Sequence, residues 1–248
     1  MSTKQANQRS FWEQAGQDGY GKAMFSNVPV EQHIRSTIWN SSIEVSRMLG
    51  LTRESKILEL GSGDGTFTGT VLANNFTYID GYDYSVSAID KANALFGSES
   101  IRFHVKNVAE LVYSPDQRWD GAFLMGFLHH VKKDASVIVS RLSKVVPNVV
   151  VADPNGNNLI RKTLELLPSY RSAGEDSFRL TQLEDFFGAA GYELVSQNII
   201  SFVPPFTPSF LLPTMIRLEK IVSSNPLLRR LNSTYVLGFK LRKGKNKD

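Results

Sequence analysis

The sequence predicts an α/β fold: a doubly wound, mostly parallel seven-stranded sheet with helices on both faces and an antiparallel edge strand. Three observations indicate this fold class. Short apolar runs alternate with helical patterns between residues 56 and 153, which is typical of βαβ units. A glycine-rich turn joins the first of these runs to a helix. Two further strand-like runs lie near the C-terminus with a long excursion between them, which favours an antiparallel addition to the sheet.

The expected elements follow one another in a regular order. A helical region within residues 10–50 comes first, and Gly50 ends it. The strands that the apolar runs predict are 56–60, 76–83, 101–106, 119–125, 149–153, 192–202 and 233–242. The predicted helices are 66–73, 86–96, 134–145, 159–167, 181–191 and 214–228. Thr181 and Glu184 are expected to form a capping box at the start of the fifth of these helices.

Length and composition favour one domain with appendages. The chain has 248 residues, of which 42% are hydrophobic, so it can bury a full core. We expect an N-terminal helical cap over residues 1–50 and a ligand-binding domain over residues 51–248. That domain carries a proline-rich apolar insertion at 202–230 and a basic tail at 240–248.

Several kinds of site and location are disfavoured by composition. Cysteine is absent, which excludes disulfides, thiolate metal sites and cysteine nucleophiles, and we expect no bound metal. The polar N-terminal residues lack the apolar core of a secretory signal. The apolar stretch 202–216 is interrupted by proline and is shorter than the roughly 20 residues that span a bilayer. We therefore expect a cytoplasmic protein with at most peripheral membrane contact.

The net charge of +4 originates in the tail. Residues 240–248 hold five bases and one acid, and without them the 28 bases and 24 acids of the chain become equal in number. A neutral body makes nucleic acid an unexpected partner. The tail is interpreted as a solvated end, and contact with an anionic membrane or a polyanion is the alternative.

The stretch ILELGSGDGTF, residues 57–67, predicts a ligand-binding loop. A buried strand runs into a turn in which every second residue is glycine, namely Gly61, Gly63 and Gly65. In an open α/β sheet, ligands bind outside the carboxyl ends of the strands, beside such a turn. Plain strand-to-helix geometry without a ligand is the alternative interpretation of the glycines.

The acids of the loop disfavour a dinucleotide as its ligand. The dinucleotide fingerprint requires a glycine where Thr66 stands. Glu59 and Asp64 would also place negative charge where a pyrophosphate has to bind. An adenosine ligand with cationic groups and no phosphate fits better, and S-adenosylmethionine has this chemistry.

The same residues resemble the first motif of class I S-adenosylmethionine-dependent methyltransferases of the small-molecule type. The resemblance implies a Rossmann-like methyltransferase fold with S-adenosyl-L-methionine as the cofactor. It also implies cofactor contacts from the motif itself, that is, from Glu59, Gly61, Ser62, Gly63 and Gly65.

Further positions match the same family. Asp83, 20 residues after Gly63 at the end of the second strand, stands where the family has the acid that binds both ribose hydroxyls, and Tyr84 would pack on the adenine. A helix N-terminal acid is the alternative role for Asp83. Asn107 occupies a position where the family usually has aspartate, although its side-chain oxygen can still accept a hydrogen bond from the adenine amine. The neighbouring Val108 N–H would contact the ring.

The stretch WDGAFLMGFLHHV, residues 119–131, resembles the fourth motif of the family. It implies that Met125 borders the cofactor at the end of its strand. Near the N-terminus, Tyr20 lies in an aromatic-rich stretch and could close over the methionine end of the cofactor. The resemblance is good over residues 50–155 and holds elsewhere only in general plan.

A general base for methyl transfer is expected after the fourth strand. Histidine suits the removal of a hydroxyl proton near neutral pH. His130 is the first candidate and His129 the second. The alternative is that either histidine caps or packs the following helix. Asp153, Asn155 and Asn158 could orient a polar acceptor or form an ordinary turn.

These observations predict methyl transfer to a small-molecule acceptor, at a hydroxyl oxygen, in secondary metabolism or in glycan or lipid biosynthesis. N-methylation of a small amine and an NAD-linked oxidoreductase are the alternatives. The apolar insertion at 202–230 suits a hydrophobic or lipid-linked acceptor, and it could equally be a subdomain core or a dimer patch. The sequence does not predict an oligomeric state.

Overall fold

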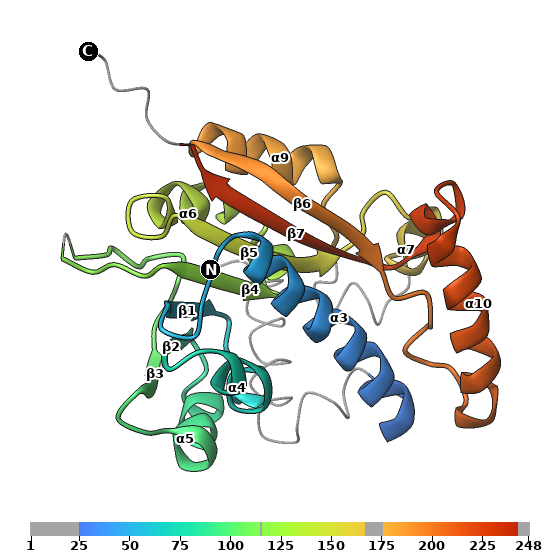
Figure 1. Ribbon diagram of the computed structural model, residues 1–248, viewed down its shortest axis with the longest axis horizontal. Coiled ribbons are helices and arrows are strands. Elements are labelled where there is room, and N and C mark those ends of the chain that lie inside the picture. The colour runs from blue at the N-terminus through green and yellow to red at the C-terminus, as the bar shows by residue number, and fades with distance from the viewer. Residues whose placement is uncertain (1–24, 115, 167–175, 243–248) are drawn as a thin grey trace.

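A seven-stranded mixed sheet forms the centre of the protein. The computed structural model describes residues 25–114, 116–166 and 176–242 (Figure 1), so the expected contact of Tyr20 lies outside the described residues. The strand order is β3-β2-β1-β4-β5-β7-β6. The first five strands in this order pair in parallel, and β7 runs antiparallel to both of its neighbours. The expected mostly parallel sheet with antiparallel pairing at one edge is confirmed.

All seven expected strands form. They are β1 Lys56–Leu60, β2 Tyr78–Asp83, β3 Ile101–Val105, β4 Gly121–Met125, β5 Asn148–Pro154, β6 Tyr192–Ile200 and β7 Thr234–Leu241. The α-helices are α3 Val28–Met48, α4 Ala73–Asn75, α5 Val86–Phe96, α6 Ala135–Leu142, α7 Leu159–Leu164, α9 Leu180–Ala189 and α10 Leu212–Ser224. A π-helical turn, η1 Thr68–Leu72, and three 3-10 turns, η2 Leu128–Val131, η3 Ser209–Leu211 and η4 Leu228–Leu231, complete the described elements.

Helices cover both faces of the sheet, as a doubly wound fold requires. Alternate residues of each central strand point to opposite faces, and in β1 the side chain of Leu58 packs in one core and that of Ile57 in the other. The core around Leu58 is covered by α6 and α9, whereas the core around Ile57 is covered by α3 and the residues that follow the glycine loop. Figure 1 shows α3 on one side of the sheet, with α6 and α9 on the other.

The strand directions place several connections at one edge of the sheet. Because β6 is antiparallel to β7 and β7 is antiparallel to β5, β6 runs in the same direction as β1 to β5. The glycine loop, η2, α7 and the insertion after β6 therefore all leave from the carboxyl edge of the parallel strands. The tail leaves from the other edge, where Leu241 donates a backbone hydrogen bond to Pro147 at the start of β5.

Two local predictions were wrong. The helix expected from Thr181 begins one residue earlier, and its N-cap is Arg179, whose backbone N–H donates to the Gln182 side chain at 2.9 Å. Thr181 is already helical and therefore cannot act as the cap. The helix expected over 214–228 ends at Ser224, because Asn225 precedes a proline and is extended. The chain turns there and continues as η4.

The helices of the described residues are too short or too polar for a membrane span: none could cross a bilayer.

Candidate functional site

The glycine loop has a backbone that only glycine adopts readily. Gly61, Gly63 and Gly65 have φ angles of 76°, 53° and 74°. A side chain at Gly61 would overlap the ring of Phe127, which follows β4, and one at Gly65 would come within 3.0 Å of Phe103 in β3. The loop is therefore packed tightly between the ends of neighbouring strands, with Gly65 buried and Gly61 and Gly63 partly buried.

The end of β2 fixes the first half of the loop. The backbone N–H groups of Gly61 and Ser62 both donate to the carbonyl oxygen of Tyr82, at 2.8 and 3.2 Å. Ser62 is buried, and its hydroxyl oxygen has no hydrogen-bond partner in the described part of the chain. A buried hydroxyl is normally paired. This group is therefore a candidate contact for a ligand.

Asp83 joins the glycine loop to the start of α5. One carboxylate oxygen accepts from the Gly63 N–H at 3.0 Å and the other accepts from the Ser85 N–H at 2.9 Å. The side chain is buried, so its orientation is fixed. A carboxylate can accept about four hydrogen bonds in all, and hydroxyl groups are among the donors with which it pairs. Asp83 thus lies beside the loop, as the sequence predicted.

Glu59 is buried at the end of β1, under the loop. Burial is the largest influence on its carboxyl group and raises the pKa to about 8, although a hydrogen bond from the Thr68 hydroxyl lowers it. The nearby carboxylates of Asp83 and Asp64 raise the pKa further. Glu59 is therefore mostly protonated at neutral pH in the unliganded protein.

The expectation that two acids of the loop present negative charge needs correction. Glu59 is mostly neutral at pH 7, for the reason just given. Asp64 accepts from the Thr66 backbone N–H at 3.2 Å and lies 3.3 Å from the ammonium of Lys91 in α5. Asp64 therefore starts the helical turn and its charge is paired, so the loop is less anionic than its sequence indicates.

The raised pKa of Glu59 predicts a stability that falls as pH rises. Between pH 4.5 and about 8 the folded protein keeps a proton that the unfolded chain has lost, so the free energy of unfolding decreases with pH. The slope is about 1.4 kcal/mol per pH unit at most. Urea unfolding of wild type and Glu59→Gln across this range measures the slope. The free energy of unfolding of wild type, relative to that of Glu59→Gln, should decrease by this amount as pH rises. Glu193→Gln, an exposed acid of β6, serves as the control and should unfold like wild type at every pH.

The remaining expected cofactor contacts lie at the ends of the next strands. Asn107 follows β3 and is exposed, and its side-chain oxygen accepts from the Ala109 N–H at 3.2 Å. Val108 is buried. Tyr84 is partly buried directly after Asp83, and a backbone bond of 2.7 Å from Lys106 to Asp83 holds the ends of β3 and β2 together. These residues follow β2 and β3, at the same edge of the sheet as the loop.

The end of β4 lies on the other side of the loop. Met125 is partly buried at this end and packs against the core under α3. Gly126 then turns the chain with a φ of 61°, and its N–H donates to the carbonyl of Ala152 in β5 at 2.7 Å. Phe127 follows and contacts Gly61. The end of β4 therefore leads directly from the glycine loop to the two histidines.

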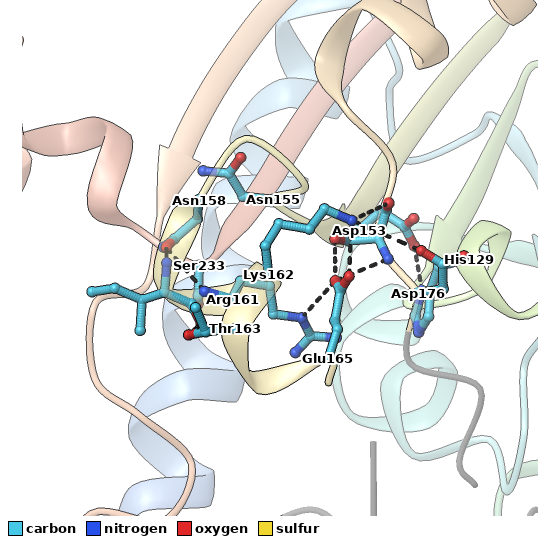
Figure 2. Close-up of polar contacts among 12 residues, drawn as sticks. His129, Asp153, Asn155, Asn158, Arg161, Lys162, Thr163, Glu165, Asp176 and Ser233 are labelled. Atoms are coloured by element: carbon cyan, nitrogen blue, oxygen red, sulfur yellow. Dashed lines mark hydrogen bonds and ion pairs between the residues drawn. The ribbon is translucent and has the colours of Figure 1, made fainter. Parts of the chain in front are cut away.

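The two histidines differ in their surroundings. His129 is buried, and its Nδ1 lies 2.8 Å from Oδ1 of Asp153 at the end of β5, as Figure 2 shows. His130 is partly exposed, and its ring lies 3.8 Å from that of His129, centre to centre. The pairing of His129 with Asp153 was not predicted from the sequence. A sequence signal was present, because His129 follows β4 and Asp153 lies at the carboxyl end of the adjacent β5.

Asn155 and Asn158 serve the fold. The Asn155 amide donates to the carbonyl of Asn232 at 2.8 Å, and the Asn158 amide donates to that of Leu231 at 2.6 Å. The Asn158 oxygen also caps α7 by accepting from the backbone N–H of Ile160 at 2.9 Å. Both side chains are buried in the junction between α7 and η4. Of the two interpretations, an ordinary structural turn agrees with these contacts.

An ion-pair network borders the histidines. Lys132, after η2, lies 2.8 Å from Asp176, while Lys162 of α7 lies 2.8 Å from Glu165 and 3.8 Å from Asp176. Glu165 also accepts from the backbone N–H of Ser177 at 3.1 Å. Figure 2 places this network beside the pair of His129 and Asp153. The network ties Asp176 and Ser177 to Lys162 of α7 and to Glu165, which follows it.

Sequence comparison identifies the family. The profile of the methyltransferase domain family matches residues 33–197. No curated protein matches the sequence significantly.

Many solved structures share this fold, and the three described next are distant from this chain in sequence. Magnesium protoporphyrin IX methyltransferase from Synechocystis PCC 6803, solved with bound S-adenosylmethionine, aligns with a TM-score of 0.62 at 12% identity over 98% of this chain and 99% of that chain. An S-adenosylmethionine-dependent methyltransferase from Mesorhizobium loti aligns with a TM-score of 0.57 at 15% identity, over 80% and 96%. The (4+2)-cyclase SpnF aligns with a TM-score of 0.58 at 16% identity, over 83% and 82%.

The cyclase shows that this fold alone does not establish methyl transfer, so the family match has to carry the assignment. The loop agrees with it, since three glycines at positive φ and the buried Ser62 hydroxyl lie beside the carboxylate of Asp83. Because the match to the profile extends over more than half of the chain, the protein belongs to the methyltransferase domain family and is a class I S-adenosylmethionine-dependent methyltransferase.

Proposed function

We propose that the enzyme methylates a hydroxyl oxygen of a small apolar molecule. The observation that carries the proposal is the contact between Gly61 of the cofactor loop and Phe127, two residues before His129. This contact supports a position of His129 and His130 near the proposed cofactor site. A hydroxyl acceptor must lose its proton as it is methylated, whereas a free amine can attack without prior deprotonation. A fixed base beside the loop therefore favours oxygen as the accepting atom.

The cofactor supplies an activated methyl group, so the protein mainly has to bind, orient and deprotonate. We assign the ribose hydroxyls to Asp83 and the adenine to Tyr84, Asn107 and Val108. The methionine part is assigned to the motif around the loop and the end of β4, that is, to Glu59, Gly61, Ser62, Gly63, Gly65 and Met125. Tyr20 and the helical cap of residues 1–50 are proposed to cover this end.

Glu59 has a particular role in this assignment. A cationic ammonium group placed near its buried carboxyl would favour the charged form and lower the raised pKa. Binding of the cofactor would then release a proton from Glu59. In this way a residue that is mostly neutral in the free enzyme would become the anionic partner of the methionine end.

His130 is proposed as the general base. It is partly exposed, so it can reach an acceptor, whereas His129 is buried and paired with Asp153. In the proposed reaction the acceptor oxygen attacks the methyl carbon as the bond from that carbon to sulfur breaks, and the hydroxyl proton passes to His130. We assign to His129 and Asp153 the task of holding the His130 ring in place, through the ring contact of 3.8 Å.

The apolar character of the acceptor is inferred from the insertion after β6. Part of the insertion is a small core, in which Val203 and Leu212 pack on Val30 and Ile34 of α3. Most side chains of residues 206–230 are exposed, and the insertion leaves β6 at the carboxyl edge, from which the glycine loop also leaves. A hydrophobic or lipid-linked acceptor, from secondary metabolism or from glycan or lipid biosynthesis, fits this setting. The cytoplasmic location expected from the sequence stays a prediction.

The accepting atom is tested with sets of apolar compounds that carry a hydroxyl, a methoxy or an amino group at one position. With methyl-labelled S-adenosylmethionine, we expect label in hydroxyl compounds and none in their methoxy counterparts. Transfer to amines that exceeds transfer to the matching hydroxyl compounds would assign the enzyme to N-methylation instead. Oxidation of any of these compounds with NAD, in the absence of S-adenosylmethionine, would support an oxidoreductase.

A further inference from the structure

The chain from residue 201 to 231 forms an excursion at the carboxyl edge of the sheet. It leaves β6, forms η3, α10 and η4, and returns as β7. Figure 1 shows α10 beside α7 at the end of the sheet, away from the point where β7 ends. We call the exposed side chains of residues 206–231, together with those at the start of α7, the insertion face.

Large apolar side chains of the insertion face are strongly exposed. Phe210 of η3 is 78% exposed, Ile221 of α10 is 61% exposed and Leu227, before η4, is 74% exposed. At the start of α7, Leu159 and Ile160 are 79% and 55% exposed. Single exposed apolar residues are ordinary, but exposed phenylalanine, leucine and isoleucine side chains over several adjoining elements mark an interaction surface.

Contacts at the base of these elements hold them together as one surface. The Asn158 side chain at the start of α7 donates to the carbonyl of Leu231 in η4 at 2.6 Å. The Asn232 side chain donates to the Ser223 hydroxyl near the end of α10 at 3.2 Å. The exposed residues of α7, η4 and α10 are therefore neighbours on a fixed support.

Helix α10 places bases beside its outermost apolar residue. Its inner face buries Leu212, Glu219 and Val222. At 100° per residue, Ile221 lies opposite this inner face, and Arg217 is four positions earlier on the same outer side. Arg217 and Lys220 are both exposed. The outer surface of α10 thus combines an apolar centre with a basic flank, which is the composition of helices that lie in a membrane interface.

All exposed charge between residues 201 and 231 is positive. This stretch contains four bases, two on α10 and two on η4, and a single acid, Glu219. Glu219 is buried and accepts from the backbone N–H groups of Phe202 and Val203, at 2.6 and 3.1 Å, and lies 2.9 Å from Nε2 of His33. The acid thus anchors α10 to α3 and contributes no charge to the outer surface.

We propose that the insertion face docks the enzyme on a lipid bilayer that carries anionic headgroups. The exposed bases complement those headgroups, and the exposed apolar side chains can enter the boundary of the acyl chains. A second copy of this chain is a poorer occupant, because a two-fold contact would place the basic η4 residues of both copies against like charges. The inference goes beyond the proposed methyl transfer and is tested without it.

The bases that the proposal assigns to membrane contact are those of the insertion face, not those of the basic tail. The tail leaves β7 at the amino edge of the parallel strands, opposite the insertion face. Lys144, which follows α6, and Lys240, on β7, are exposed toward that opposite edge. These two lysines are therefore matched controls for bases of the insertion face.

The test is co-sedimentation of the full-length enzyme with vesicles of phosphatidylcholine alone and of phosphatidylcholine mixed with phosphatidylserine. We expect binding to the anionic vesicles, weakened by more than about tenfold in the double variant Arg229→Glu, Arg230→Glu. The double variant Lys144→Glu, Lys240→Glu should bind like wild type. Ile221→Ser should also weaken binding, whereas Leu95→Ser, at an α5 position with the same 61% exposure, should not.

Other outcomes would overturn the proposal. Absence of binding to anionic vesicles would do so, and so would an equal effect of the two charge-reversal variants. Sedimentation equilibrium is the accompanying measurement: a dimer that Ile221→Ser dissociates, without vesicle binding by wild type, would assign the face to self-association. Binding of S-adenosylhomocysteine, measured on the same preparations, should be unchanged in every variant, which separates this inference from the cofactor site.

Discussion

Replacement of Asp83 by alanine is expected to weaken binding of S-adenosylhomocysteine by about a hundredfold to ten-thousandfold. In the assignment proposed above, two hydrogen bonds from ribose hydroxyls to the carboxylate are lost, and each bond to a charged group is worth about 1.5–3 kcal/mol. The carboxylate also holds the N–H groups of Gly63 and Ser85, so the loop loses one of its supports as well. Both effects weaken the binding of S-adenosylhomocysteine.

Calorimetric titration of wild type and variant with S-adenosylhomocysteine measures this loss. Asp83→Asn keeps the size of the side chain and one acceptor oxygen. Its affinity for S-adenosylhomocysteine should therefore lie between those of wild type and Asp83→Ala. Asp90→Ala, at an exposed position of α5, is the matched control and should bind like wild type. Thermal unfolding without ligand shows whether each variant is folded. NADH should not bind to any of these proteins.

Wild-type affinity in the folded Asp83→Ala variant would leave Asp83 with the alternative role of a structural acid at the start of α5. Its bond to Ser85 fits that role equally well, since Ser85 caps the helix through its own hydroxyl. The binding measurement is needed because hydrogen bonds within the protein do not distinguish the two roles.

The parts of the fold that local sequence signals determine were predictable. Helix α5 forms over the predicted residues 86–96, because Ser85 supplies a cap and the apolar positions recur at helical spacing. The glycine loop was predictable for a similar reason, since alternating glycines after a buried strand can adopt the positive φ angles observed at Gly61 and Gly65. The parallel pairing of β1 to β5 followed from the alternation of strands and helices, whereas their order in the sheet did not.

Features that depend on distant residues were not predictable in this way. The neutral state of Glu59 results from burial and from two neighbouring carboxylates, and the charge of Asp64 is paired with Lys91 in another helix. The bond of Glu219 to His33 joins residues on α10 and α3. Each of these contacts links segments that the sequence separates by many residues, and they decide which acids remain charged and accessible.

The pairing of His129 with Asp153 changes how the histidines can be tested. The sequence offered two adjacent candidates for the base, with packing of the next helix as the alternative for each. In the structure His129 is the packed histidine and His130 the accessible one. A mutation at either position can lower activity, so loss of turnover alone does not identify the base.

His130→Ala is expected to lower kcat by about a hundredfold to ten-thousandfold, which is the usual contribution of a general base. Affinity for S-adenosylhomocysteine should remain unchanged, because His130 is assigned to the acceptor. His104→Ala, at a partly exposed histidine of β3, is the control and should keep wild-type turnover. The measurement is the rate of methyl transfer at saturating cofactor, with a hydroxyl acceptor, as a function of pH.

The pH dependence separates a base from a residue that only packs. If His130 takes the proton, the wild-type rate rises with pH as the imidazole becomes neutral, and this rise is absent in His130→Ala. Asp153→Asn should lower kcat while the rise remains, because it disturbs the orientation of His129 and leaves His130 able to titrate. A His130→Ala enzyme that is slower but whose rate still rises with pH would contradict the assignment. If this rise is absent in His129→Ala and present in His130→Ala, the buried histidine is the base.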